Sequence, residues 1–387
     1  MARREKKPKV PTTMRTASIS LEVSASAHAA LEALRSAYAD ACNLLVPVVV
    51  ETRCWNRYKL HRQVYRRLRD ETPLGAQMCC NVLRSVTAAY RTMSANGDLP
   101  KDEPVPAISF RGTAVHFDQR TFAMRGDSLS LYTLEGRVVV TLKPGEHQQR
   151  LLKWGKPKEA ELIYRKGKWF FNLVVEKEIA YREAGPVLGL DVGENNLAAT
   201  STGRIWGGGG LRFERDKHLA LRRRTQSNGS ESARQLLRKV SGREQRHMRH
   251  VNHVVSKQIV NEAVSIGARA IAMEDLTNIR DRIKAGIRVR SRLHRWAFRQ
   301  LQDFVAYKAA ERGIATVFVN PAYSSKSCND CGQIGLRVKH RFTCDCGRRA
   351  HSDVNAASNL AGRGERALSP RGDVSRPNVA VSHDDDR

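Results

Sequence analysis

Residues 328–361 read CNDCGQIGLRVKHRFTCDCGRRAHSDVNAASNLA and place four thiols just before an acidic residue. The thiols form a CxxC pair and a CxC pair, namely Cys328, Cys331, Cys344 and Cys346. Four thiolates at this spacing can occupy the corners of a tetrahedron, the geometry of Zn²⁺ in closed structural sites. Because Asp353 follows within a few residues, the stretch predicts a zinc knuckle beside an acidic site.

The charge of the whole chain points to a polyanionic partner. Its 387 residues include 67 Lys and Arg against 39 Asp and Glu, a formal net charge of +28. Nucleic acid fits this excess best, and an acidic membrane surface is the alternative. The sequence shows no long uninterrupted apolar run and no signal-peptide pattern after MARREKKPKV, so we expect a soluble protein inside the cell. Its eight cysteines suit a reducing compartment.

The N-terminal part predicts a strand followed by basic helices. Residues 16–23 alternate as a half-buried strand does, and a helix follows with Ser24 or Ser26 as its cap. From Trp55 to Met93 the helical pattern continues, interleaved with Tyr58, Tyr65, Tyr90, Arg62, Arg66, Arg67 and Arg69. This pattern indicates either a lobe that faces nucleic acid or a solvated basic surface over an aliphatic core.

A β-rich region extends from about Pro104 to Glu178. Its short runs are AISF, AVHF, SLSLYTL, RVVVTL, AELIYR and KWFFNLVVE, which is typical of a small barrel or sandwich. Lys166-Gly167-Lys168 predicts a hairpin turn between the last two runs. Its lysines could face a phosphate backbone or simply be part of a soluble turn.

Three acidic residues follow apolar runs in the C-terminal part. VLGLDVG places Asp191 after one strand, ARAIAMED places Glu274 and Asp275 after a second, and Asp353 follows a third strand at the start of a helix capped by Ser352. The order strand, strand, helix, strand, helix, strand, knuckle, helix predicts an α/β sheet domain, in which such positions meet at one sheet edge. Spacing alone does not choose between Glu274 and Asp275.

Three converging carboxylates would repel one another unless divalent cations neutralise them. Mg²⁺ prefers oxygen ligands, and two ions ~3.5–4 Å apart would support phosphodiester hydrolysis. Each residue alone has a simpler interpretation, since Asp191 could form a turn and Asp353 could stabilise a helix N-terminus. The joint pattern favours a nuclease site.

These motifs resemble a known family. GLDVGENNLAATS, AIAMEDLTNI, PAYSSKSCNDCG with FTCDCG, and HSDVNAASNL look like the three RuvC-type nuclease motifs and the zinc finger of TnpB, the RNA-guided endonuclease encoded by insertion sequences. The resemblance covers residues 187–361, and type V CRISPR effectors share this nuclease half. It implies an α/β fold: an RNase H-like (RuvC) nuclease domain with an inserted zinc finger, preceded by a β-barrel wedge domain that carries an inserted helical recognition lobe.

The resemblance also assigns residues and boundaries. It makes Asp191, Glu274 and Asp353 the catalytic ligands of two Mg²⁺ ions, and the four cysteines the ligands of a structural Zn²⁺, although many members have CxxC where this chain has CxC. The implied segments are a disordered basic arm at 1–12, the wedge at 13–23 and 104–180, the recognition lobe at 24–103, the nuclease at 187–322 and 350–363, the zinc finger at 323–349, and a disordered tail at 364–387.

The resemblance implies a guide RNA and target DNA as partners, no membrane, and a cytoplasmic, nucleoid-associated location in a prokaryotic cell. The sequence does not determine the oligomeric state, for which a monomer is favoured. Pairing with the guide would supply sequence specificity, while the protein holds the heteroduplex by shape and backbone. The alternatives are a compact type V CRISPR effector, a non-cleaving RNA-guided repressor, a transposase or its accessory factor, and a structural zinc-bearing RNA-binding protein. The repressor would be marked by a lost carboxylate, and the transposase by a different catalytic residue.

Overall fold

The computed structural model describes residues 10–99, 104–112, 114–193, 195–240, 242–276 and 298–369, and these divide into two compact units. The first unit is Thr12–Glu178, and the second comprises the described residues of Met1–Pro11 and Ile179–Arg387. The segment 277–297, which includes most of the basic run 280–299, lies outside the described residues. Residues 1–9 and 370–387, which make up most of the predicted arm and tail, lie outside them as well.

The first unit is built on a seven-stranded antiparallel sheet with the order β2-β6-β7-β1-β5-β4-β3. Its strands are β1 Thr12–Glu22, β2 Val115–Asp118, β3 Phe122–Arg125, β4 Ser128–Thr133, β5 Gly136–Lys143, β6 Lys156–Arg165 and β7 Lys168–Glu178. The two edge strands, β2 and β3, are joined by residues 119–121, and the Thr121 N–H donates to the Asp118 carbonyl at 3.0 Å. Because a short turn brings the two edges together, the sheet is nearly closed.

The predicted hairpin is present between β6 and β7. Lys166 and Gly167 have φ of 53° and 75°, the positive values that a two-residue turn of the I′ type requires. Along β7, Trp169, Phe171 and Leu173 are buried at every second position. This alternation gives the strand one face toward the core.

One β prediction in this unit was wrong, and one strand was missed. AISF, residues 107–110, forms no strand, because the side chain of Asn43 pairs with both backbone groups of Phe110, at 2.9 Å to its carbonyl and 2.8 Å from its N–H. Strand β3 was not predicted, since its four residues are too few to show a clear alternation.

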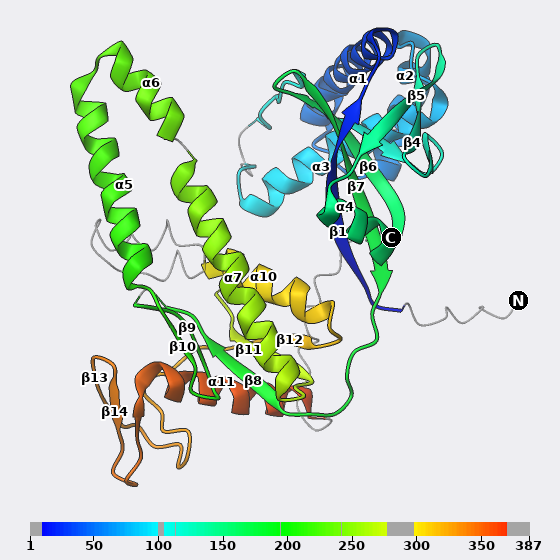
Figure 1. Ribbon diagram of the computed structural model, residues 1–387. Coiled ribbons are helices and arrows are strands. Elements are labelled where there is room, and N and C mark those ends of the chain that lie inside the picture. The colour runs from blue at the N-terminus through cyan, green and yellow to red at the C-terminus, as the bar shows by residue number, and fades with distance from the viewer. Residues whose placement is uncertain are drawn as a thin grey trace, which may run out of the picture. The chain divides into compact units, whose positions relative to one another are not determined.

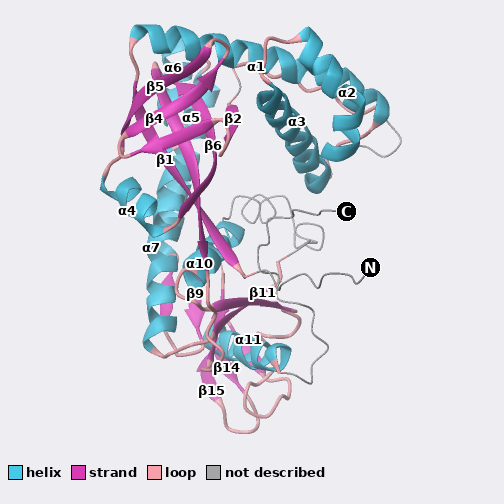
Figure 2. Ribbon diagram, turned by 90° about the vertical axis from the view of Figure 1, so that its right-hand side faces the viewer, coloured by secondary structure: helices cyan, strands magenta, loops and turns pink. Residues whose placement is uncertain are grey.

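Three helices are inserted between β1 and β2, and Figures 1 and 2 show them grouped beside the strands of this unit. They are α1 Ala25–Thr52, α2 Arg57–Glu71 and α3 Ala76–Asn96, while the shorter α4 Glu146–Trp154 follows β5. Ser24 caps α1, since its Oγ accepts from the Ala27 N–H at 3.2 Å. Helix α1 is long and apolar enough to span a membrane by length and composition, but Leu31, Leu34 and Tyr38 are buried in the unit's core.

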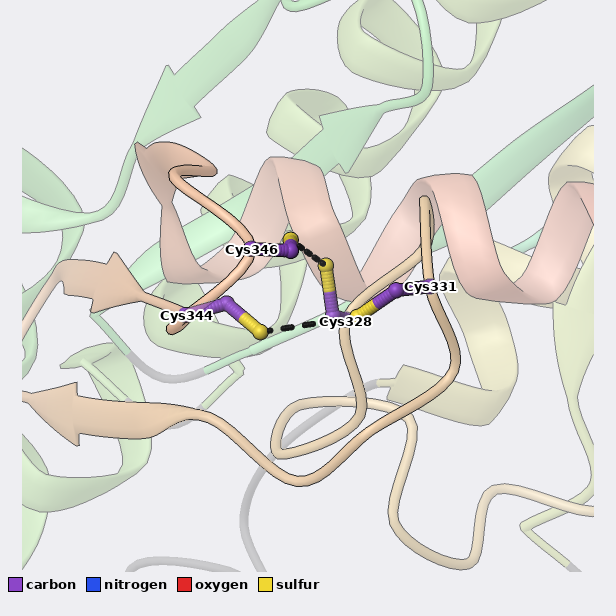
Figure 3. A group of neighbouring side chains, drawn as sticks. All are labelled: Cys328, Cys331, Cys344 and Cys346. Carbon is purple, nitrogen blue, oxygen red and sulfur yellow. Dashed lines mark hydrogen bonds between the residues drawn. The ribbon is translucent and has the colours of Figure 1, made fainter.

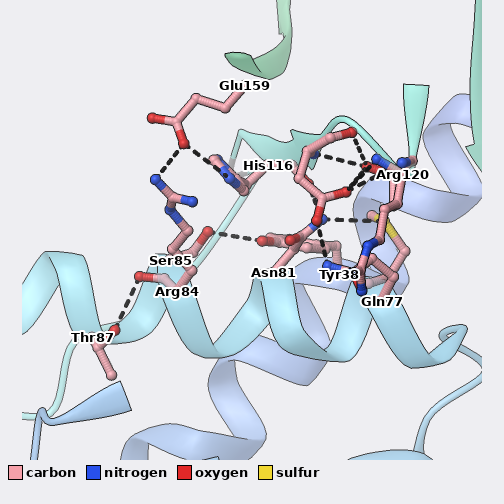
Figure 4. Close-up of polar contacts among 12 residues, drawn as sticks. Tyr38, Gln77, Asn81, Arg84, Ser85, Thr87, His116, Arg120 and Glu159 are labelled. Atoms are coloured by element: carbon pink, nitrogen blue, oxygen red, sulfur yellow. Dashed lines mark hydrogen bonds and ion pairs between the residues drawn. The ribbon is translucent and has the colours of Figure 1, made fainter. Parts of the chain in front are cut away.

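Polar contacts fix α3 to the sheet (Figure 4). Asn81 donates to the His116 carbonyl at 3.1 Å, and Arg84 forms an ion pair with Glu159. Tyr38 of α1 and Ser85 are joined by a hydrogen bond of 2.8 Å. The inserted helices therefore share an apolar core with the strands. We call the contacts of Asn81 with His116 and of Arg84 with Glu159 the polar seam.

The second unit contains a five-stranded sheet with the order β10-β9-β8-β11-β12. Its strands are β8 Val187–Asp191, β9 Asn196–Thr200, β10 Ile205–Gly207, β11 Ala270–Glu274 and β12 Ala315–Val319. Strand β11 runs parallel to both β8 and β12, whereas β9 is antiparallel to β8 and β10. The parallel trio places three carboxyl ends at one edge of the sheet.

Helices cover both faces of this sheet. Leu188 and Ile271 pack with residues of α7 Arg243–Ser265 and α10 Phe298–Ala310. On the other face, Val187 and Ala272 pack with Leu360 of α11 Ser352–Leu368. Two further helices, α5 Gly209–Asn228 and α6 Glu231–Val240, lie between β10 and α7 in the chain.

The cysteine segment folds as a small antiparallel sheet before α11. Its strands are β13 Leu336–Val338, β14 Arg341–Thr343 and β15 Arg349–His351, in that order. None of the three was predicted, because each has only three residues and shows no alternation that could be recognised.

Two predictions about α11 were wrong. Its cap is His351 rather than Ser352, since the His351 Nδ1 accepts from the Asp353 N–H at 3.3 Å. The helix also continues to Leu368, past the predicted boundary at 363–364. Glu365 explains the continuation, because its carboxylate accepts from the Val187 N–H and forms an ion pair with Arg269.

Candidate metal-binding sites

Two of the three predicted carboxylates meet at the carboxyl edge of the second sheet. Strands β8 and β11 run in parallel with Leu190 opposite Met273, so Asp191 and Glu274 are the next residues on each strand. Their side chains are close enough for a protonated Asp191 to donate a hydrogen bond to Glu274. Glu274 rather than the neighbouring Asp275 makes this contact, and Asp275 is exposed.

The third carboxylate is brought to the same region by close packing of α11 on β8. A Cβ atom added to Gly189 would lie 1.8 Å from the carbonyl oxygen of Ala357, so only glycine allows this approach. Ala356 and Ala357 are both buried, which explains the small residues of the motif DVNAAS. Asp353, at the second position of α11, consequently lies within electrostatic range of Asp191.

Asp353 is held by three donors. The Asn196 Nδ2 donates to it at 2.8 Å, the Ser352 Oγ at 3.1 Å and the Arg337 Nη2 at 3.3 Å. Its side chain is 16% exposed, so these contacts are only partly screened by water. We define Asp191, Glu274 and Asp353 as the acidic cluster.

The acidic cluster carries an electrostatic cost. Burial raises the pKa of Asp191 well above its usual range, and the charges of Glu274 and Asp353 raise it further. Burial also raises the pKa of Glu274, although the hydrogen bond from Asp191 and the charge of Arg363 oppose that change. An all-oxygen set of this kind fits Mg²⁺, which would neutralise the repulsion.

Three residues near the acidic cluster were missed by the sequence analysis. Asn196 begins β9, Arg337 lies on β13 of the cysteine segment, and Arg363 lies on α11. Asn196 follows Asp191 in the motif DVGENN, which was the available signal. The two arginines were hidden in a chain with many basic residues.

The four predicted cysteines converge (Figure 3). All four sulfurs lie within 4.8 Å of one another, with 3.7 Å between the sulfurs of Cys328 and Cys346 and 3.6 Å between those of Cys331 and Cys344. Tetrahedral coordination with Zn–S bonds of about 2.3 Å separates sulfurs by about 3.8 Å. We define these residues as the thiolate cluster, and its geometry fits a structural Zn²⁺.

Local backbone geometry supports the thiolate cluster despite its short CxC half. Gly332 and Gly347 follow the two pairs with φ of 78° and 94°, which lets the chain turn tightly behind each pair. Burial of Cys328 disfavours its thiolate, but N–H groups of Cys331 and Asp330 donate to its sulfur, and its pKa is lowered to about 7. Such a thiol is readily deprotonated for metal binding.

Two asparagines of α11 tie the cysteine segment to the helix that carries Asp353. Asn355 donates to the Ser327 carbonyl at 2.7 Å and accepts from the Asn329 N–H at 3.3 Å. Asn359, one turn later, donates to the carbonyls of Ser324 and Ser327. One helix therefore positions the thiolate cluster and a member of the acidic cluster together.

These features define the class of protein. It has an α/β unit with an acidic cluster at the carboxyl edge of its sheet, and helix α11, which carries Asp353 of that cluster, also contacts the segment with the four cysteines. A family model described as the TNB domain of Cas12f1-like proteins matches residues 298–360. The chain is 28% identical over 259 residues to TnpB-like protein MJ0751 of Methanocaldococcus jannaschii, covering 62% of this chain and 91% of that protein.

A second relative is the CRISPR-associated endodeoxyribonuclease Cas12f1 of Sulfoacidibacillus thermotolerans. Identity is 43% over 114 residues, which cover 28% of this chain and only 26% of the length of that protein. Among solved structures, the Cas12f1-sgRNA-target DNA complex superposes with a TM-score of 0.62 and 14% identity, covering 86% of this chain and 82% of that chain. The chain is a relative of the TnpB-like proteins and the Cas12f effectors, which confirms the resemblance of its motifs.

Proposed function

We propose that the chain is an RNA-guided DNA endonuclease of an insertion sequence, with guide RNA and target DNA as its partners. The observation that carries the proposal is the acidic cluster, in which Asp191 of β8 contacts Glu274 of β11 while Asp353 of α11 lies within electrostatic range of Asp191. Natural proteins keep such clusters mainly where a cation or a reaction requires them. The order of the five strands and the flanking helices support an RNase H-like, RuvC-type nuclease domain.

Asp191, Glu274 and Asp353 would hold two Mg²⁺ ions. When bound, these ions would supply an activated water and stabilise the leaving oxygen of a phosphodiester. Asn196 and Arg337 would orient Asp353, to which both donate. Arg363, whose charge opposes the raised pKa of Glu274, would favour the ionised form of that carboxylate.

The thiolate cluster would have a structural role. Zn²⁺ there would fix the segment that carries Arg337 and contacts Asn355 and Asn359 of α11. In the first unit, the nearly closed sheet would serve as the wedge domain and α1–α3 as the recognition lobe.

A compact type V CRISPR effector is the second candidate. The 43% identity to a Cas12f1 protein favours it, whereas the coverage of a TnpB-like protein over nearly its whole length favours the first. Sequencing the RNA that purifies with the protein separates them, since a transposon-end transcript supports the first candidate and repeat-derived RNA supports the second.

The proposal is tested by cleavage of a matched DNA target in the presence of the RNA that copurifies with the chain. Asp191→Asn removes a charge with almost no change in side-chain volume, and we expect cleavage to fall by roughly a thousandfold while RNA binding is retained. Full cleavage by this variant would contradict the proposal.

A further inference from the structure

A hollow of about 590 Å³ lies on the first compact unit. The end of α1, the loop that follows it, the start of α2 and a residue of α3 form its walls. Its volume falls in the range of ligand pockets, about 300–1,000 Å³. Neither the acidic cluster nor the thiolate cluster contributes to it, because both belong to the second unit.

One wall of the hollow is aromatic. Trp55 lines it and also packs against the apolar core of the unit, so its ring is supported from behind. The side chain is half-buried, which leaves part of the ring facing the hollow. A supported indole ring is a suitable surface for stacking a nucleobase.

The other walls are cationic and polar. Arg53, Lys59 and Arg91 line the hollow, whereas none of the described residues that line it is acidic. Asn56 and Gln63 add amide groups that can pair with the edge of a base. Three positive charges around one hollow favour a phosphate-bearing ligand.

The backbone is well defined at two of these cationic residues. Arg53 ends α1 with φ of 47° and ψ of 33°, a left-handed conformation that residues other than glycine adopt at an energetic cost. The Asn56 side chain accepts from the N–H groups of Tyr58 and Lys59 at 3.0 and 3.1 Å, which fixes the first turn of α2.

We infer that this hollow binds one unpaired nucleotide, with its base stacked on Trp55 and its phosphate beside Arg53, Lys59 and Arg91. The nucleotide is unpaired because a base inside a duplex has both faces covered by its neighbours. The guide RNA and a separated DNA strand could each supply it. The inference rests on the proposed function in taking nucleic acid as the partner, but it does not require cleavage.

The test measures the affinity of the full-length chain for a single-stranded RNA, a single-stranded DNA and a duplex of the same sequence by fluorescence anisotropy. Trp55→Ala should weaken single-strand binding by about tenfold or more, and Trp55→Phe should restore most of it. Binding of the duplex should change by less than about threefold. The single strand that loses more affinity identifies the source of the nucleotide.

A charge reversal tests the hollow without disturbing the core. Lys59 and Arg62 are exposed cations of the same helix, and only Lys59 lines the hollow. Lys59→Glu should weaken single-strand binding several times more than the control Arg62→Glu. Equal effects of these two variants, or equal loss of single-strand and duplex binding in Trp55→Ala, would overturn the inference.

The outcome is separable from that of the proposed function. If the wild-type chain binds single strands through Trp55 but does not cleave DNA, the proposed function is contradicted and the inference about the hollow is supported. If the chain cleaves DNA and Trp55→Ala leaves its single-strand affinity unchanged, only the inference that the hollow binds a nucleotide is contradicted.

Discussion

The two compact units differ in how their polar side chains are paired. In the first unit the groups are complementary: the buried Asn81 donates to a carbonyl, and the partly exposed Arg84 pairs with Glu159. In the second unit, Asp191 and Glu274 are both acidic and are nevertheless in contact, so ionisation of one disfavours ionisation of the other. Complementary burial stabilises a fold, whereas like-charge burial costs stability and indicates a cation site.

The largest effect should separate two adjacent acidic residues, one at the end of β11 and one just after it. Glu274→Gln should reduce DNA cleavage by roughly a thousandfold, because Glu274 contacts Asp191. Asp275→Asn, at the exposed neighbouring position, should leave cleavage within about threefold of wild type. A similar loss in both variants would contradict the assignment of Glu274.

The thiolate cluster should show a structural rather than a chemical effect. Cys328→Ser should abolish stoichiometric zinc, measured by elemental analysis, and should reduce cleavage by about tenfold or more, because the segment beside Asp353 loses its support. Cys80→Ser is the control, since Cys80 is half-buried and lies outside both the thiolate cluster and the hollow. Retained zinc in the Cys328 variant would show that the cluster is not the metal site.

The polar seam of the first unit should affect stability alone. Asn81→Ala removes the donor to the buried His116 carbonyl and should lower the free energy of unfolding by about 2–3 kcal/mol. Urea denaturation measures this change. A loss below about 0.5 kcal/mol would mean that the seam does not stabilise the unit.

The smallest effect concerns pH. Burial, followed by the charge of Arg84, lowers the pKa of His116 to about 4. The unfolded chain therefore binds this proton more readily, with a pKa of about 6.5, so stability is present above that value and is lost as pH falls toward 4. We expect a loss of about 2 kcal/mol between about pH 7 and pH 5 that His116→Gln lacks. If the free energy of unfolding depends on pH identically in wild type and in His116→Gln, the role given to His116 is contradicted.

The sequence predicted the elements whose evidence is local. The cysteine spacing, the strand ends at Asp191 and Glu274, and the Lys166-Gly167 turn each depend on a few neighbouring residues. Contacts between distant segments were not predictable. Asn43 replaces a strand partner of Phe110, and Arg337 reaches Asp353 from another element, although nothing in their local sequence indicates it.

The central claim, that the acidic side chains of the second unit are brought together to bind a cation, is tested by thermal unfolding with and without Mg²⁺. Without metal, Asp191→Asn should be at least as stable as wild type, because it removes a carboxyl group whose ionisation is disfavoured by burial and by Glu274 and Asp353. With Mg²⁺, wild type should gain stability and the variant should not. An equal response of the two proteins to Mg²⁺ would contradict the claim.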